Sequence, residues 1–285
     1  MEITCIGGIV RDVTYRARVS LERGTSNIVA TREGFGGVAR NVAENLARLG
    51  RPVSLVSRVG SDGADILEHA GTAGIDTSRI ETAEGPTARY VAVLEPDGSL
   101  AMGLADMAAL DSLDAAFVVR ADPRGAVFAD CNLASDALEH LADSETITFL
   151  AIDAVSRAKV RRLPRDLTGI DLLFLNRDEA EALTGEGETN EQYNRLLERG
   201  VGAVVLTLGE EGAIAASRED VATISAPPVK VVDVTGAGDA LAAGTLHALL
   251  DGASLPEAVA SACRLAARTC ASEGAVCPAM ESEHV

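Results

Sequence analysis

Short apolar runs alternate along the chain with longer segments in which apolar residues recur every three or four positions. The short runs have the length and composition of strands that are buried on both faces of a sheet. They occupy residues 3–6, 53–56, 126–129, 147–152, 172–175 and 203–207. The longer segments have the period of helices that bury one face. They occupy residues 38–50, 62–73, 133–142, 177–183, 190–199 and 255–272. This alternation predicts an α/β fold with a mostly parallel central sheet and helices on both faces.

Two segments, residues 12–34 and 86–104, break this rhythm because their apolar and polar residues alternate one by one. Such alternation is typical of antiparallel strands with one face in water. Pro96-Asp97-Gly98 in the second segment predicts a hairpin turn. The chain has no internal repeat or evident linker, so we expect one α/β domain over residues 1–285, with these two segments forming a small β-sheet lid over a site.

The formal net charge of −18 at pH 7 changes the picture of possible partners. A surface this acidic repels both the phosphate backbone of nucleic acids and an anionic membrane. Fixed backbone dipoles or a metal ion can still hold a phosphorylated small molecule. Charge therefore argues against nucleic acid and membrane as partners and leaves nucleotides open.

The five cysteines are an odd number and include no Cys-x-x-Cys pair, which argues against a disulfide framework or a zinc site. The first residues, MEITCIGGIVRD, lack the basic and apolar regions of a signal peptide. No apolar run approaches the length of a membrane span. We expect a soluble cytoplasmic protein with reduced thiols.

Polar residues follow several of the predicted strands, and ligands of open parallel sheets bind at the carboxyl ends of strands. They are Asp130, Asn132, Asp153, Asn176 and Glu179, and the loop LGEEG (208–212), which contains Gly209, follows the last of these strands. Each one alone is weak support, because loops are polar in general. Because all of them lie at the same edge of the predicted sheet, we expect the binding site at that edge.

The stretch DVTGAGDALAAG places Gly236, Ala237 and Gly238 directly before Asp239 at the predicted start of a helix. Glycines let backbone N–H groups face inward, and a helix N-terminus adds partial positive charge, so residues 235–238 could hold a phosphate or a developing oxyanion. Asp239 beside them could accept the proton of a hydroxyl that attacks phosphorus. A plain glycine turn with an acid in the first helical turn explains the same residues, and they do not decide between the two.

Other ways of handling phosphate are missing. There is no G-x-x-x-x-G-K-[ST] motif, and the two lysines, Lys159 and Lys230, lie in no glycine-rich loop. Charge neutralisation is therefore expected from amides and Mg²⁺. The sequence GFGGVA (34–39) follows a lid segment rather than the opening strand of a βαβ unit, which disfavours a nicotinamide enzyme.

With these motifs in place, the chain resembles over essentially its whole length the ribokinase-like, or PfkB, family of carbohydrate and nucleoside kinases. GGVARNVAENLARLG (36–50) is similar to the family's Gly-Gly motif and Asn-bearing helix, and DVTGAGDALAAG to its anion hole with a catalytic Asp. NRDE (176–179) is similar to the N-x-x-E element, and TLGEEG (207–212) to the nucleotide-binding T-x-G-x-x-G. The resemblance implies a ribokinase-like fold and an ATP-dependent phosphotransferase with an alcohol acceptor.

The resemblance also implies a role for each matching position. Asp239 becomes the catalytic base, and the amides of Gly236, Ala237 and Gly238 stabilise the transferring phosphoryl group. Asn176 and Glu179 would orient Mg²⁺ through water, and the backbone around Asp233 matches a site for a monovalent cation such as K⁺. Contacts with ATP are implied for Asn176, Thr207, Gly209, Thr235, Gly236 and Gly238. Contacts with substrate hydroxyls are implied for Asp12, Gly36, Gly37 and Asn41, although Asn41 could instead be a capping or solvent-facing amide.

Within the family, several segments resemble the pseudouridine kinase group. They are GGVARN (36–41), ADM (105–107), ADCNL (129–133) and IDAVSRAK (152–159), with Ala105 and Ala154 departing from the Asn and Pro of that group. A C-linked uracil presents two N–H donors and two carbonyls, and residues of matching chemistry are Thr87, Arg89, Asp106 and Asn132.

The expected reaction is therefore phosphorylation of the 5′-hydroxyl of pseudouridine by ATP. The alternatives are a kinase for another nucleoside or a sugar, such as ribose, adenosine, cytidine or a fructose phosphate, and a non-catalytic sensor that keeps the fold. An exposed sheet edge invites pairing, so a homodimer through the lid is a further expectation.

Overall fold

The computed structural model describes residues 1–278, and the end of the predicted domain, 279–285, lies outside the described residues. Within residues 1–278, nine strands form a large sheet in the order β13-β12-β11-β10-β9-β8-β1-β4-β5. Neighbours from β11 to β5 pair in parallel, and β12 and β13 add an antiparallel edge. The strands are β1 (Ile3–Ile6), β4 (Val53–Val59), β5 (Ile80–Thr82), β8 (Gly125–Asp130), β9 (Ile147–Asp153), β10 (Leu172–Asn176), β11 (Ala203–Thr207), β12 (Ala213–Ser217) and β13 (Val221–Ile224).

Both faces of this sheet are buried, which is why its strands read as continuous apolar runs. Alternate residues of one strand enter different cores: Val127 of β8 joins one hydrophobic cluster, while Phe128 joins the other. Leu173 and Leu172 of β10 divide in the same way. The predicted doubly covered parallel sheet is therefore confirmed.

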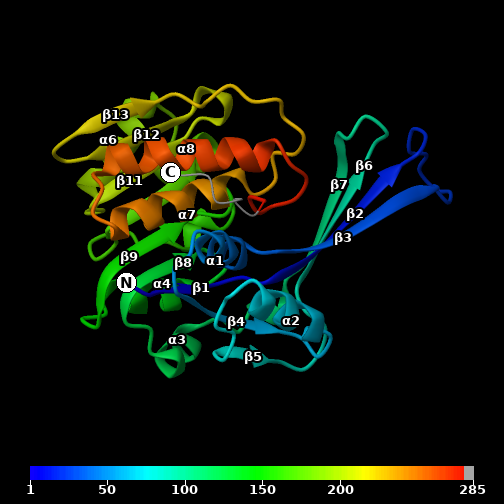
Figure 1. Ribbon diagram of the computed structural model, residues 1–285, viewed down its shortest axis with the longest axis horizontal. Helices are drawn as coiled ribbons and strands as arrows, with labels where there is room; N and C mark the ends of the chain where they lie inside the picture. Colours follow the sequence, from blue (N-terminus) through cyan, green and yellow to red (C-terminus); the bar gives the residue numbers. More distant parts are fainter. Residues whose placement is uncertain (279–285) are drawn as a thin grey trace.

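Each core is closed by its own layer of helices (Figure 1). On one face lie α1 (Val38–Arg48), α2 (Ala64–Thr72), α7 (Ala237–Leu250) and α8 (Leu255–Cys270). On the other lie α3 (Ala115–Ala121), α4 (Ser135–Ala142), α5 (Arg177–Thr184) and α6 (Thr189–Glu198). Short 3₁₀ turns are Ala108–Leu110, Val160–Arg162 and Gly209–Glu211. The helix α3 and the strands β5, β12 and β13 were not predicted, because their apolar patterns are short and weakly periodic.

A second sheet stands apart from the main body and projects from it (Figure 1). Its strands, in spatial order, are β3 (Val29–Gly36), β2 (Val10–Ala17), β6 (Arg89–Leu94) and β7 (Leu100–Asp106). The hairpins β2–β3 and β6–β7 are antiparallel, and β2 pairs with β6 in parallel. The hairpin turn at Pro96-Asp97-Gly98 is confirmed, since the Gly98 amide donates to the Glu95 carbonyl at 2.9 Å.

The remaining general expectations concern thiols and membranes. The five cysteines are free, four of them buried and Cys270 partly exposed. Among the described helices, none has the length and apolar character that crossing a bilayer requires.

Candidate active site

The stretch DVTGAGDALAAG forms the turn into α7, and its glycines have a steric reason. Gly236 caps the helix with φ 75°, and a Cβ there would lie 2.0 Å from the carbonyl oxygen of Ala275. Only glycine tolerates both the left-handed backbone and this close approach. The first-turn amides of a helix have no intrahelical acceptor, although Ala237 N–H makes a long hydrogen bond of 3.3 Å to Val234. The turn thus presents a helix N-terminus suited to an anion.

The ends of three parallel strands meet at Asp239. A cavity of about 170 Å³ is lined by Asp153 at the end of β9, Asn176 at the end of β10, Thr207 at the end of β11, and also by Glu179, Gly238 and Asp239. Three of these residues, Asp153, Asn176 and Glu179, were predicted at one sheet edge, and the structure brings them to one cavity.

The environment of Asp239 shapes its chemistry. Burial raises the pKa of Asp239 to about 7, opposed by the hydrogen bond from Asn41. The negative charges of Asp130 and Asp12 act in the same direction as burial, and the positive charge of Arg40 acts against it. A carboxyl group whose pKa lies near neutrality is well matched to accepting a proton at physiological pH.

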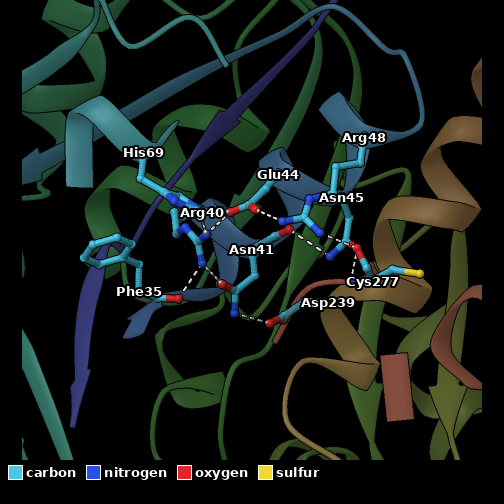
Figure 2. A network of polar contacts seen from close by, with 9 residues as sticks. All are labelled: Phe35, Arg40, Asn41, Glu44, Asn45, Arg48, His69, Asp239 and Cys277. Carbon is cyan, nitrogen blue, oxygen red and sulfur yellow. Dashed lines mark hydrogen bonds and ion pairs between the residues drawn. The ribbon is translucent and has the colours of Figure 1, made fainter. Parts of the chain in front are cut away.

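Asn41 reaches across from α1 to this carboxylate. Its Nδ2 donates to Asp239 Oδ2 at 2.6 Å (Figure 2). The side chain is 5 % exposed, so Asn41 is neither a helix cap nor a solvent-facing amide. The predicted substrate residue and the predicted base therefore form one unit.

The glycine pair before α1 brings Asp12 into the same site. Gly37 has φ 97°, and a Cβ there would lie 2.2 Å from the carbonyl oxygen of Gly8. A Cβ on Gly36 would lie 2.0 Å from Asp12 Oδ2. Burial raises the pKa of Asp12 to about 6, and Arg40 opposes that rise. The strand β2 and the start of α1 can approach this closely because neither glycine has a side chain.

Asp130, at the end of β8, holds together the backbone segments beneath the site. Its fully buried carboxylate accepts hydrogen bonds from the amides of Gly8 at 3.0 Å, Ala39 at 2.8 Å and Asn132 at 2.9 Å. The sequence marked Asp130 only as a polar strand end. The structure shows that it ties β1, α1 and the loop after β8 together.

Asn132 is 3 % exposed and lies beside Gly8, where a Cβ would come within 2.5 Å of its Nδ2. Lys159 Nζ donates to Asn132 Oδ1, and Arg162 donates to the backbone carbonyl of Asn132 at 2.8 Å. The sequence did not single out Lys159 and Arg162 as site residues. Lys159 could have been found from the sequence, because it ends the segment IDAVSRAK (152–159).

Two of the other proposed base readers, Thr87 and Arg89, lie against Asp62, and the third, Asp106, lies opposite Arg89. The Thr87 hydroxyl donates to Asp62 Oδ1 at 2.6 Å and accepts from the Gly60 amide at 2.9 Å. Arg89 lies 3.7 Å from Asp62 Oδ2, and Asp106 pairs with Arg89 in register across β6 and β7. Within residues 1–278, no hydrogen bond or ion pair joins this group to Asn132, so the structure does not gather the four residues into one cluster.

A larger cavity of about 850 Å³ opens on the other side of the α7 N-terminus. Three of the six residues predicted to contact ATP, Thr207, Gly209 and Gly238, line it, whereas Asn176 and Gly236 do not. The rest of the wall contains the acidic Glu210 and is otherwise mainly apolar: Gly212, Ala226, Pro227, Pro228, Val229, Val231, Val234, Ala237, Leu241, Cys263, Ala266, Ala267 and Cys270. Thr235 is exposed and does not line the cavity. An apolar cavity that ends at a helix N-terminus suits a ligand with a flat ring and phosphates.

Asn176 and Glu179 begin α5 with a reciprocal cap. Asn176 Oδ1 accepts from the Glu179 amide at 2.9 Å, and Glu179 Oε2 accepts from the Asn176 amide at 2.8 Å. Burial raises the pKa of both Glu179 and Asp153. Buried carboxyl groups that face one cavity fit a divalent cation. Among the described residues no three His, Cys, Asp or Glu side chains are grouped as ligands of an ion, so water and phosphate oxygens would have to complete its coordination.

Asp233 organises the loop before α7. Its carboxylate accepts from the amides of Thr235 at 2.9 Å and Gly274 at 3.1 Å, and Arg32 of β3 lies 3.8 Å away. Burial acts to raise the pKa of Asp233, but the hydrogen bonds from Thr235 and Gly274 and the charge of Arg32 lower it overall. The ion pair of Arg32 with Asp233 therefore connects the lid to the loop before α7.

Comparisons with known proteins agree with this geometry. Residues 1–282 match the pfkB family of carbohydrate kinases. Pseudouridine kinase of Escherichia coli K12 is 30% identical over 283 residues, which cover 94% of this chain and 90% of that protein. Guanosine-inosine kinase of Exiguobacterium acetylicum is 27% identical over 297 residues, with 98% of each chain covered.

A solved structure of a carbohydrate kinase from Agrobacterium tumefaciens superposes with a TM-score of 0.81 at 32% identity, covering 96% of this chain and 92% of that one. The relatives are named for different acceptors, and all of them are kinases. The chain belongs to the pfkB family of carbohydrate kinases, which are ATP-dependent phosphotransferases with a hydroxyl acceptor.

Proposed function

We propose that this kinase phosphorylates the 5′-hydroxyl of pseudouridine, giving pseudouridine 5′-phosphate and ADP. The observation that carries a nucleobase substrate is the pair of Asn132 and Lys159. The amide of Asn132 lies beside Gly8, and the Lys159 ammonium holds the oxygen of that amide. Asn132 and Lys159 follow β8 and β9, whereas the nucleotide cavity lies at the end of β11. The 30% identity to a pseudouridine kinase supports the same choice.

In the proposed reaction, Asp239 accepts the proton of the substrate hydroxyl. The hydroxyl oxygen forms a bond to the γ-phosphorus of ATP, the bond from that phosphorus to the bridging oxygen breaks, and the electron pair leaves with ADP. Asn41 holds Oδ2 of Asp239, which leaves Oδ1 for the substrate. The backbone amides of Gly236, Ala237 and Gly238 at the α7 N-terminus face the charge that develops on the phosphoryl oxygens.

Asn176 and Glu179 would hold Mg²⁺ through water, with Asp153 on the same cavity wall. The ion neutralises phosphate charge when bound. A monovalent cation beside the backbone of Asp233 remains part of the proposal, although the Asp233 carboxylate already has two amide donors and a nearby guanidinium.

The substrate hydroxyls would be held by Asp12, Asn41 and the backbone of Gly36 and Gly37. Asn132 would read one edge of the uracil ring, with Lys159 fixing its amide. Thr87, Arg89 and Asp106 would contact the base only if the lid moves toward the main body, because in this structure Thr87 and Arg89 face Asp62 and Asp106 lies opposite Arg89.

We also propose that two copies associate through the lid. Leu100, Met102 and Leu104 of the edge strand β7 are 58 %, 52 % and 52 % exposed. Met102 and Leu104 lie two positions apart with no register shift between them, so these two share one face. Burying them against a second copy would remove apolar surface from water. A cytoplasmic location fits the five free thiols.

A substrate panel tests the proposal. Release of ADP is measured with pseudouridine, uridine, cytidine, adenosine, inosine, guanosine, ribose and fructose phosphate at equal concentrations. We expect the largest kcat/KM with pseudouridine. Faster turnover of inosine or guanosine would instead favour the function of the relative from Exiguobacterium acetylicum, and binding of pseudouridine without any transfer would indicate a sensor.

A further inference from the structure

The side chain of Asn41 has a donor end and an acceptor end, and only one orientation suits Asp239. Nδ2 donates to Asp239 Oδ2 at 2.6 Å. With the amide turned over, Oδ1 would face the carboxylate and two acceptors would oppose each other. Something must therefore fix the amide.

Arg40 supplies that restraint. Its NH1 donates to Asn41 Oδ1 at 2.7 Å and to the carbonyl oxygen of Phe35 at 2.5 Å. Since a guanidinium has donors only, Asn41 must present its oxygen to Arg40 and its nitrogen to Asp239. The side chain of Arg40 is 3 % exposed, so water does not compete for these contacts.

The other end of the guanidinium is held by Glu44. Arg40 NH2 donates to Glu44 Oε2, and the buried carboxylate of Glu44 also contacts Arg48 and, at 3.1 Å, His69 (Figure 2). The planar guanidinium is thus fixed between a backbone carbonyl, an amide and a carboxylate. Burial lowers the pKa of Arg40 to about 10, so the group stays positively charged throughout the neutral range.

We propose that Arg40 is a positioning residue for phosphoryl transfer: it locks the Asn41 amide so that Nδ2 holds one oxygen of Asp239 and the other oxygen is free for the substrate hydroxyl. This inference rests on the proposed role of Asp239 as the base. In this proposal Arg40 does not touch the substrate. It sets the orientation of Asn41, which does.

Charge gives Arg40 a second effect on the same carboxylate. The groups that act on Asp239 from the surrounding elements are Asp12 of β2, Asp130 of β8, Asp153 of β9 and Arg40 of α1. Arg40 is the cation in this set. Without Arg40 no positive charge of this set opposes the acidic groups. The pKa of Asp239 would therefore rise, and the carboxyl group would keep its proton to a higher pH.

The test compares Arg40→Met with Arg48→Met. Both variants remove one cationic partner of Glu44, and each leaves Glu44 a remaining arginine and His69. Arg48→Met also loses the hydrogen bond to the Cys277 carbonyl, which makes it a demanding control because it too loses a contact of α1. Only Arg40→Met loses the contact to Asn41. We expect Arg40→Met to lower kcat by roughly 10–100-fold and to move the acid limb of the kcat/KM pH profile to higher pH. Arg48→Met should leave the acid limb in place.

Two further variants separate charge from orientation and guard against misfolding. Arg40→Lys keeps the charge but not the fork, so the acid limb should stay near its normal position while kcat remains low. If Arg40→Met does not fold, Arg40→Met combined with Glu44→Gln removes the facing carboxylate charge as well, and circular dichroism checks the fold of each variant.

A double-mutant cycle with Asn41→Ala identifies the route. If Arg40 acts through Asn41, Arg40→Met should lower kcat by less than about threefold in the Asn41→Ala background. Equal losses in both backgrounds, or the same kcat and acid limb for Arg40→Met and Arg48→Met, would overturn the inference. Asp239→Asn is measured alongside. If this variant retains activity, the proposed base is wrong. If it is inactive but the effects of the Arg40 and Asn41 substitutions are additive, the base stands and only the proposed role of Arg40 is refuted.

Discussion

Gly236 lies directly against Ala275, so that a Cβ on Gly236 would come within 2.0 Å of the Ala275 carbonyl oxygen. The segment after α8 is in turn tied to α1, because the Cys277 amide donates to Asn45 Oδ1 at 3.1 Å and Arg48 donates to the Cys277 carbonyl at 2.5 Å. The α7 N-terminus, α1 and the segment after α8 are therefore packed as one unit around Asp239. A disturbance at Gly236 should spread to all three.

Substitution of the two glycines of the turn should separate folding from nucleotide binding. Gly236→Ala places a Cβ on a left-handed backbone and against Ala275, so we expect a loss of roughly 1–3 kcal/mol in the free energy of unfolding. A Cβ on Gly238 meets no atom within 4 Å and faces the nucleotide cavity. Gly238→Ala should therefore keep its stability and raise the KM for ATP. Urea unfolding and ATP titrations measure the two effects, and equal stability of both variants would contradict the steric role of Gly236.

The fold was predictable because its strands are buried on both faces. The run ITCI becomes the fully buried β1, and the alternating segments become the lid hairpins. What the pattern could not give was the partner of each strand. The parallel pairing of β2 with β6 joins strands that are separated along the chain by β3, α1, β4, α2 and β5. Neither strand's own sequence indicates that neighbour.

Asp239→Asn should abolish transfer and stabilise the free protein. The pKa of Asp239 is raised from 3.8 to about 7, so the folded state binds this proton more tightly than the unfolded state. Stability from this group is present below pH 3.8 and is lost as the pH rises through about 7. Above pH 7, the variant should gain on the order of 2–4 kcal/mol. Thermal melting without nucleotide at pH 4 and pH 8 checks the sign: the gain should appear at pH 8 and shrink at pH 4.

Glu179→Gln tests the cation without destroying the helix cap. Glutamine can still accept from the Asn176 amide, as Glu179 Oε2 does at 2.8 Å, so the reciprocal cap should survive. The lost charge should raise the Mg²⁺ concentration needed for half-maximal activity by about tenfold, because the cavity keeps one carboxylate fewer. Glu179→Ala is the comparison that loses both cap and charge. Identical Mg²⁺ dependence in Glu179→Gln and the unaltered enzyme would argue against Glu179 at the ion.

The site was less predictable than the fold, and the reason lies in contacts between side chains. Sequence motifs located Asp239 and Asn41, but not the hydrogen bond that joins α1 to α7 across the site. Arg40 lies in the segment GGVARN (36–41), from which no role was assigned to Arg40 itself, and its guanidinium is buried. The role of Asp130 depends on three amides from separate segments, which no local pattern reveals.

Charges on the lid edge should separate the two copies of the proposed dimer. Leu104→Glu combined with Met102→Glu places two carboxylates on the exposed face of β7, and burying them against a second acidic chain would cost far more than the apolar contact gains. The control is Val221→Glu, at another exposed apolar position, 46 % exposed, on the edge strand β13 of the main body. Sedimentation equilibrium at micromolar concentration should show a dimer for the unaltered chain and for Val221→Glu, and a monomer for the double variant. Because each site lies within one copy, the monomer should keep its catalytic residues in place. Any loss of kcat in the monomer would then measure how much dimerisation stabilises the position of the lid. A monomeric unaltered chain, or a dimer that survives both substitutions, would rule out association through this face.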